Sequence, residues 1–145
     1  MPFTFAHPAI ILPLKRYFPR KFSLTGLVSG SLIPDFEYFL IMNMQSHFSH
    51  TLAGIVYFGL PLALLLSLIF HHIIRDTLIQ NLPVLFKSRL KPFVGLNWFS
   101  YFSQNKIIVM TSILMGALSH LFWDGFTHKN GFWVQQISLL QGHLT

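Results

Sequence analysis

Long apolar runs alternate with short polar stretches along this chain, and three of the runs approach the length of a membrane span. A spanning helix needs about 20 mostly apolar residues. The clearest run covers residues 52–74, where Pro61 predicts a kink that neighbouring helices tolerate. The other two cover residues 107–123 and 22–44. The pattern predicts an all-α, polytopic membrane bundle of about three spanning helices.

The run at residues 22–44 is the weakest of the three by hydropathy. It contains Gly26, Gly30, Pro34, Asp35 and Glu37, a set that a helix facing lipid on every side would not carry. We therefore expect this helix to face its neighbours.

The two remaining segments differ from a simple span. In residues 1–16 the apolar residues precede Lys15 and Arg16, the reverse of a secretory signal, and the apolar stretch is too short to cross a bilayer. We expect a retained interfacial or re-entrant segment. In residues 75–106, Lys87, Arg89 and Lys91 alternate with leucines and aromatics. This is either a basic amphipathic interfacial segment or a plain loop with a solvated charge run.

Composition supports a single integral membrane domain over residues 1–145. The chain is 52% hydrophobic and 10% charged, with a mean hydropathy of +0.55, whereas soluble domains carry about 25% charged residues. The net charge of +6 does not indicate nucleic-acid binding, because the basic residues flank apolar runs. Membrane lipids with anionic headgroups are the expected partners. The chain has no cysteine, so a metal ion here would need imidazole and carboxylate ligands.

The basic residues also predict an orientation. They lie in two groups, one before the first run and one between the second and third: Lys15, Arg16, Arg20 and Lys21, then Arg75, Lys87, Arg89, Lys91 and Lys106. Both groups should be cytoplasmic, which places His50, Asp124 and His128 on the extracytoplasmic side. Asp35 follows Lys21, and His120 follows Lys106, by about 14 positions, roughly 21 Å of helix. These two side chains should therefore lie at matching depth.

The acids and histidines within or beside apolar runs are the candidate functional residues, because charge in a membrane needs a partner or a role. His120, Asp124 and His128 follow one another at four-residue spacing, which puts them on one helical face. Gly125 and Gly131 indicate that this helix can end before His128. The His120–Asp124 pair is either a pair of metal ligands or a pair that caps a helix or makes an interhelical hydrogen bond.

Three further residues join this set. Asp35 follows Pro34 and is either a metal ligand or the cap of a re-entrant helix. Glu37 is a proton shuttle or an interfacial residue. His50, preferred over His47, directly precedes an apolar run that Ser49 or Thr51 can cap. His71 and His72, beside Arg75, are expected to be interfacial caps.

Four blocks, MPFTFAHPA, GSLIPDFEYF, SHTLAG and SHLFWDGFTHKNGFWV, together resemble an uncharacterised bacterial membrane-protein family, domain of unknown function number 4184. The resemblance covers essentially the whole chain. It implies a location in the bacterial cytoplasmic membrane, in which the basic residues would place the polar cluster on the extracytoplasmic side. Members of that family continue into further apolar segments, so the resemblance also implies that this chain is C-terminally incomplete.

The order of histidines and aspartates is more distantly similar to membrane-bound metal-dependent hydrolases and to zinc-dependent phospholipase C and single-strand nucleases. That similarity implies Zn²⁺, with His7 and Asp124 holding one ion and Asp35, His50 and His120 another. It further implies that Asp124 bridges and that His128 reaches a third ion. The second His-x-x-x-Glu pair of those enzymes is absent here, so fewer ions, or none, are expected.

Two functions are therefore open from the sequence. One is a membrane-embedded, metal-dependent hydrolase of phosphoesters or lipid headgroups, with Asp35 or Glu37 as general base. The other is a non-enzymatic membrane protein whose histidines and aspartates serve helix packing or the handling of ions or protons.

Overall fold

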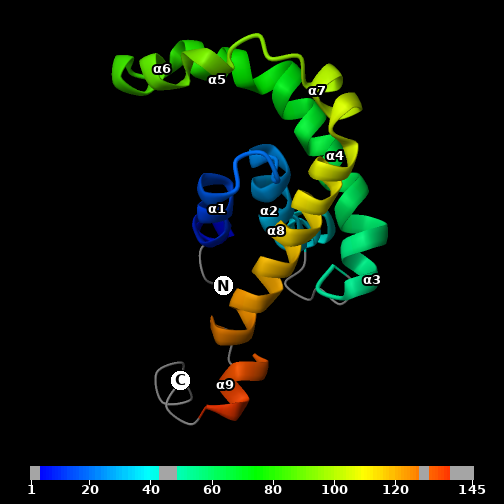
Figure 1. The fold of residues 1–145 in the computed structure, drawn as a ribbon. Coiled ribbons are helices and arrows are strands. Elements are labelled where there is room, and N and C mark those ends of the chain that lie inside the picture. Colours follow the sequence, from blue (N-terminus) through cyan, green and yellow to red (C-terminus); the bar gives the residue numbers. More distant parts are fainter. Residues whose placement is uncertain (1–3, 43–48, 128–130, 138–145) are drawn as a thin grey trace.

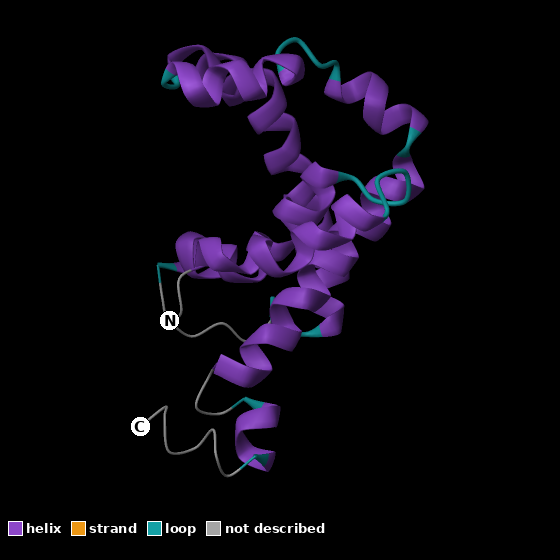
Figure 2. Ribbon diagram, turned by 60° about the vertical axis from the view of Figure 1, so that its left-hand side comes forward, coloured by secondary structure: helices purple, strands orange, loops and turns teal. Residues whose placement is uncertain are grey.

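Two helices that lie far apart in sequence form the centre of the molecule: α2, Leu24–Ile41, and α8, Lys106–Thr127. The computed structural model describes residues 4–42, 49–127 and 131–137, and within those ranges every regular element is helical (Figures 1 and 2). Ser23 begins α2 by accepting the backbone N–H of Gly26. The all-helical class predicted from the sequence is confirmed for these residues.

The remaining elements follow in chain order. Before α2 come a 3₁₀ turn η1, Thr4–Ala6, and α1, His7–Tyr17. After it come α3, Leu52–Gly54; π-helical η2, Ile55–Gly59; α4, Leu60–Ile69; π-helical η3, Phe70–Ile74; and α5, Arg75–Asn81. Next are α6, Val84–Leu90; 3₁₀ η4, Lys91–Phe93; and α7, Trp98–Gln104, with α9, Phe132–Gln136, after α8.

Two stretches are long and apolar enough to cross a membrane. The most apolar 18 residues of Leu52–Asn81, which joins α3 to α5, have a mean hydropathy of 2.3, and those of Lys106–Gln136, which contains α8 and α9, have one of 1.5. Thr51 caps the start of Leu52–Asn81 by accepting the backbone N–H of Gly54. It is one of the two capping residues expected from the sequence. The 18-residue α2 is not among them, so the count of three spans stays a prediction.

Close backbone contact joins α2 to α8, and the two helices run parallel, because Ser23 contacts Ser112 whereas Ser31, further along α2, contacts His120, further along α8. A Cβ added to Gly30 would overlap the carbonyl oxygen of Ile113, and one added to Gly116 would overlap that of Leu27. Near the start of both helices, the N–H of Ser23 donates to Ser112 Oγ at 2.8 Å. Small residues at four-residue spacing permit this approach.

The segments α1 and Leu52–Asn81 run antiparallel to α2. Lys15 Nζ, near the end of α1, donates to the carbonyl of Phe22 before α2 begins. Thr25, in the first turn of α2, lies 2.9 Å from Nε2 of His71 near the end of the long helix. The four long segments therefore alternate in direction, with α2 and α8 packed side by side in the middle (Figure 1).

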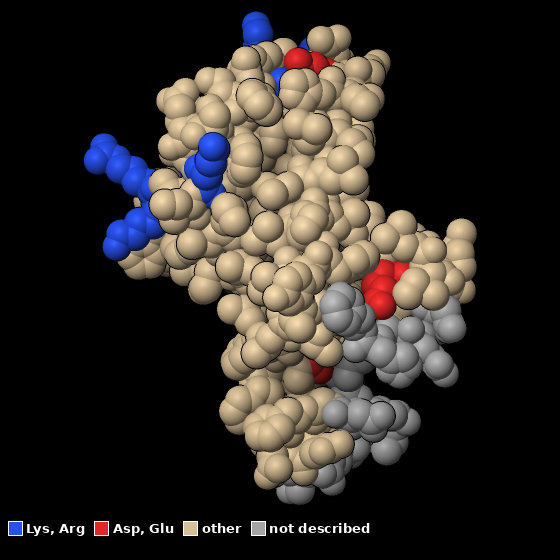
Figure 3. Space-filling model, turned by 90° about the vertical axis from the view of Figure 1, so that its right-hand side faces the viewer, with Lys and Arg blue, Asp and Glu red and all other residues tan. Residues whose placement is uncertain are grey.

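Charge is segregated along the resulting axis. The described lysines and arginines lie near the end of α1, the start of α2, the end of Leu52–Asn81 and the start of α8, which we call the basic end. Asp35, Glu37 and Asp124 lie towards the opposite end, and Asp76 is paired with Arg75 at 2.7 Å. Figure 3 shows the lysines and arginines in the upper half of one face and most of the visible acid below.

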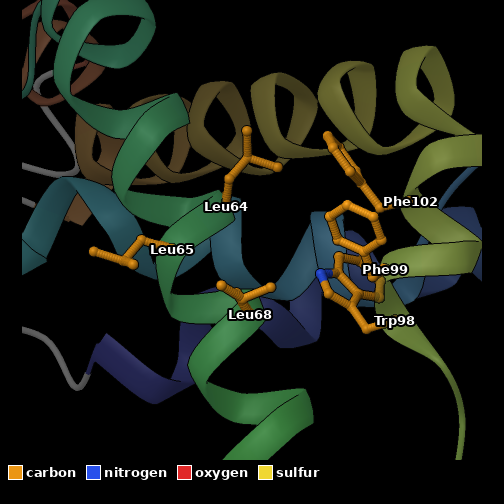
Figure 4. Close-up of a pocket in the computed structure, with 6 residues that line it drawn as sticks. All are labelled: Leu64, Leu65, Leu68, Trp98, Phe99 and Phe102. Carbon is orange, nitrogen blue, oxygen red and sulfur yellow. The ribbon is translucent and has the colours of Figure 1, made fainter.

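The connection between the two apolar stretches is helical over much of its length, so it is not a plain loop. Its α7 returns alongside α4. Leu64, Leu65 and Leu68 of α4 face Trp98, Phe99 and Phe102 of α7 across an apolar cavity of about 210 Å³ (Figure 4). Ala63, Trp98 and Ile113 belong to the core behind it.

We predict that Gly30→Ala destabilises the protein by about 1–3 kcal/mol or more, because the added methyl meets the backbone of α8. Alanine normally stabilises a helix relative to glycine, so a loss of stability in this variant identifies the clash. Gly59→Ala is the matched control, since its Cβ would meet the Cγ2 methyl of Ile33 at 3.0 Å and the carbonyl oxygen of Gly54 at an ordinary 3.6 Å. Thermal unfolding of the purified protein in detergent measures both, and equal melting temperatures for the two variants would contradict the packing described.

Candidate metal centre

The site is built from the α2–α8 contact outwards, beginning with His120. This side chain is fully buried, and its Nδ1–H donates to the carbonyl oxygen of Ser31 at 2.7 Å. Nε2 therefore carries the lone pair of the neutral ring. It lies 3.1 Å from Asp124 Oδ2 and 3.4 Å from Asp35 Oδ1, yet it makes no hydrogen bond of good geometry to a described residue.

The two carboxylates approach this nitrogen from different helices. Asp124 lies one helical turn after His120, because α8 continues unbroken to Thr127. Asp35 projects from α2 immediately after Pro34 and is only 6% exposed. Thr4 Oγ1 donates to Asp35 Oδ2 at 2.5 Å, so that Asp35 Oδ1 is the oxygen facing the imidazoles. The α1–η1 segment thus fixes which carboxylate oxygen points into the site.

The second imidazole comes from the segment that precedes the helix cap at Thr51. His50 Nε2 lies 3.5 Å from Asp124 Oδ2 and 3.9 Å from Asp35 Oδ1. The hydroxyl of Ser49 donates to the carbonyl of Pro34 at 2.8 Å and lies 3.1 Å from His50 Nδ1. Since the hydroxyl proton is directed to Pro34, Nδ1 of His50 is the donor in this contact. Both histidines therefore present Nε2 to the carboxylates.

Glu37 and His7 support this arrangement from two sides. Glu37 Oε2 accepts the backbone N–H of Ser49 at 2.8 Å and so ties the His50 segment to α2. His7, at the start of α1, stacks on His120 with ring centroids 3.8 Å apart. Its Nε2 lies 3.8 Å from Asp124 Oδ1. Both side chains are buried.

The ligand atoms of Asp35, His50, His120 and Asp124 all lie within 4.8 Å of one another, so the group could hold a metal ion. Neutral imidazole nitrogens and carboxylate oxygens suit Zn²⁺ and similar divalent ions. In metal sites, a ligating histidine usually donates its other ring N–H to a carbonyl or another acceptor, as both rings do here. The donor set therefore fits such an ion. His50 and Asp124 are partly exposed, which leaves one side of the group accessible.

Four of the predicted site residues thus meet, and Asp35 of α2 lies beside His120 of α8, as their matching positions along the two helices predicted. His7 adjoins the group through Asp124 and the ring of His120. Glu37 stands apart from it and contacts Ser49. His128 lies outside the described residues. Thr4, Ser31 and Ser49, which orient the group, have no recognisable signal in the sequence.

Comparison with known proteins agrees with the resemblance over the whole chain. The family described as Domain of unknown function (DUF4184) matches residues 1–145. The chain belongs to this family. No curated protein and no solved structure matches it. The distant similarity of this DUF4184 protein to hydrolases therefore stays a prediction.

The contact between Glu37 and Ser49 yields a prediction about stability. Glu37→Ala should lower the free energy of unfolding by roughly 1–3 kcal/mol, because it leaves the buried Ser49 N–H without this acceptor. Glu37→Gln is the control, since its amide oxygen can still accept. Thermal unfolding in detergent compares the two variants, and an equal loss in both would contradict the supporting role.

Proposed function

We propose that this DUF4184 protein is a membrane-embedded, zinc-dependent hydrolase of phosphoesters, with lipid headgroups as the substrate class. One observation carries the proposal. Two buried or half-buried histidines each direct Nδ1–H to a protein oxygen and Nε2 to the same pair of carboxylates. Asp35, His50, His120 and Asp124 would hold the ion, and His7 would support it through Asp124 and His120.

A bound Zn²⁺ would supply Lewis acidity, which polarises a phosphoryl oxygen and makes water more acidic. The chain's own residues would orient the two imidazole rings and accept protons beside the ion. The Ser31 carbonyl and the Ser49 hydroxyl fix the two ring orientations. Asp35 and Glu37 are the proposed proton acceptors.

The exposure of the apolar helices supports a membrane location. Only 28% and 33% of the residues in their most apolar windows are buried within the chain, whereas the core helix of a soluble protein is mostly buried. The remaining apolar surface suits lipid. We propose that α2 is the third span, packed against both of the others.

The charge segregation supports an orientation. The basic end would face the cytoplasm of a bacterium, by the usual bias of Lys and Arg. The metal centre would then lie in the outer half of the bilayer, where headgroups of the outer leaflet could reach its accessible side.

A second function has a specific observation in its favour. His120 lies close enough to pair directly with both carboxylates, at 3.1 and 3.4 Å, so the same residues could join α2 to α8 without a metal ion. This reading makes the protein a non-enzymatic membrane protein whose polar residues specify packing or handle protons.

Metal analysis separates the two functions. We expect about one zinc ion per chain in protein purified in detergent without chelator, and a loss of most of it in His50→Ala and Asp35→Asn. His72→Ala and Asp76→Asn are matched controls, because both positions lie at the basic end. His50 is the preferred histidine to replace, since it is not part of the α2–α8 contact. Wild-type levels of metal in the site variants, or none in the wild type, would refute the metal centre.

Hydrolysis is tested on the same preparations. The zinc-loaded protein should release the headgroup from phospholipid vesicles and cleave a soluble chromogenic phosphodiester. Chelation and His50→Ala should remove both activities, whereas His72→Ala should retain them. Protein that binds zinc through these residues but leaves both substrates intact would refute the hydrolase and retain the metal centre.

The orientation gives a separate prediction. The chain lacks cysteine, so Gln136→Cys in α9 and Ser88→Cys in α6 each introduce one thiol. A membrane-impermeant maleimide applied to intact spheroplasts should label Gln136→Cys, and should label Ser88→Cys only after permeabilisation. The opposite pattern would show that the basic end faces outwards.

A further inference from the structure

Residues 83–97, which we call the basic arm, are exposed along their whole length. Every residue in this range is exposed, including the whole of α6 and η4. Its exposed apolar side chains are Val84, Leu85, Phe86, Leu90, Phe93, Val94 and Leu96. Such a concentration of exposed apolar residues indicates a surface with a partner.

The arm is nonetheless held in place at both of its ends. Lys87 Nζ donates to the carbonyl of Gln80 near the end of α5. At the other end, Arg75 Nη1 donates to the carbonyl of Leu96 at 2.8 Å, and the carboxylate of Asp76 accepts the N–H of Gly95. The arm is thus fixed to both ends of α5 and projects from one end of the molecule (Figure 1).

The residues of the arm combine two chemistries at helical spacing. Phe86 and Leu90 share a face of α6, and Lys87 precedes Lys91 by the same four positions. Arg89 lies between Lys87 and Lys91 in the sequence. Its aliphatic stem is long enough to lie along an apolar surface while the guanidinium stays in a polar environment. Apolar and basic residues therefore occupy the same short helix, as in segments that lie in a membrane interface.

We propose that the basic arm lies flat on an anionic lipid leaflet, with Leu85, Phe86 and Leu90 in the acyl boundary and its three cations on headgroup phosphates. The arm begins where the apolar stretch Leu52–Asn81 ends, so it is at the height of the headgroups. Residues 77–106 contain no acid, which makes the segment complementary to anionic lipid.

The distribution of acids argues against a second copy of this chain as the occupant. Asp35, Glu37 and Asp124 lie towards the opposite end and take part in the contacts of the metal centre. Asp76 is paired with Arg75. The described surface therefore offers little negative charge that a neighbouring copy could present to the arm.

Spin labels on the cysteine-less chain test this proposal. The full chain is labelled at Phe86→Cys, reconstituted in nanodiscs of phosphatidylcholine alone or mixed with phosphatidylglycerol, and probed with oxygen and a nickel chelate. Tyr57→Cys, which is exposed in the middle of an apolar stretch, and Ser88→Cys are the lipid-facing and polar controls. In anionic discs we expect Phe86→Cys to resemble Tyr57→Cys, and Ser88→Cys to stay accessible to nickel.

Removing the charges tests the electrostatic part. Replacing Lys87, Arg89 and Lys91 by Gln should lower the inserted fraction in anionic discs, with the insertion equilibrium weakened about fivefold per charge. High salt should do the same, whereas zwitterionic discs should show little change.

Three results would overturn the proposal. These are nickel access to Phe86→Cys in anionic discs, equal insertion with and without the three charges, and spin–spin broadening that reveals a second copy on the arm. The zinc content should not change in the charge variant, so this test and that of the hydrolase fail independently.

Discussion

The geometry of the candidate metal centre depends on the absence of two side chains, those of Gly30 and Gly116. At these positions the backbones of α2 and α8 approach so closely that a Cβ would overlap a carbonyl oxygen. This approach brings the short imidazole of His120 within 2.7 Å of the Ser31 carbonyl. It also brings Asp35 of one helix to the histidine of the other. A wider separation would lengthen both contacts together, so packing and site cannot vary independently.

The site consequently has a fixed inner half and a more accessible outer half. His120 and Asp35 are buried between packed helices, whereas His50 comes from a short segment that Glu37 and Ser49 tie to α2. His50 is also the more exposed of the two histidines. In the proposed hydrolase, a substrate would therefore approach on the side of His50.

Part of this arrangement could be predicted from the sequence because it follows from local periodicity or from counting along helices. The His120–Asp124 pair is one helical turn, and the matching depths of Asp35 and His120 follow from the rise per residue. The supporting contacts could not be predicted, because hydroxyls and carbonyls such as those of Thr4 and Ser31 occur throughout the chain. His71, expected to be an interfacial cap, instead stacks on Trp98 and lies between Arg75 and Thr25. That environment arises only when the connection between the two apolar stretches folds back and brings Trp98 of α7 to His71.

Charge balance gives a reason why this scaffold suits a divalent ion. Two carboxylates within a few ångströms of each other in a poorly solvated site repel and need compensating positive charge. Without a metal ion, compensation would require a second proton on the imidazoles, at Nε2, because each ring directs its Nδ1–H away from the carboxylates. A divalent cation would cancel both negative charges while leaving both rings neutral, in the tautomer that their hydrogen bonds already favour.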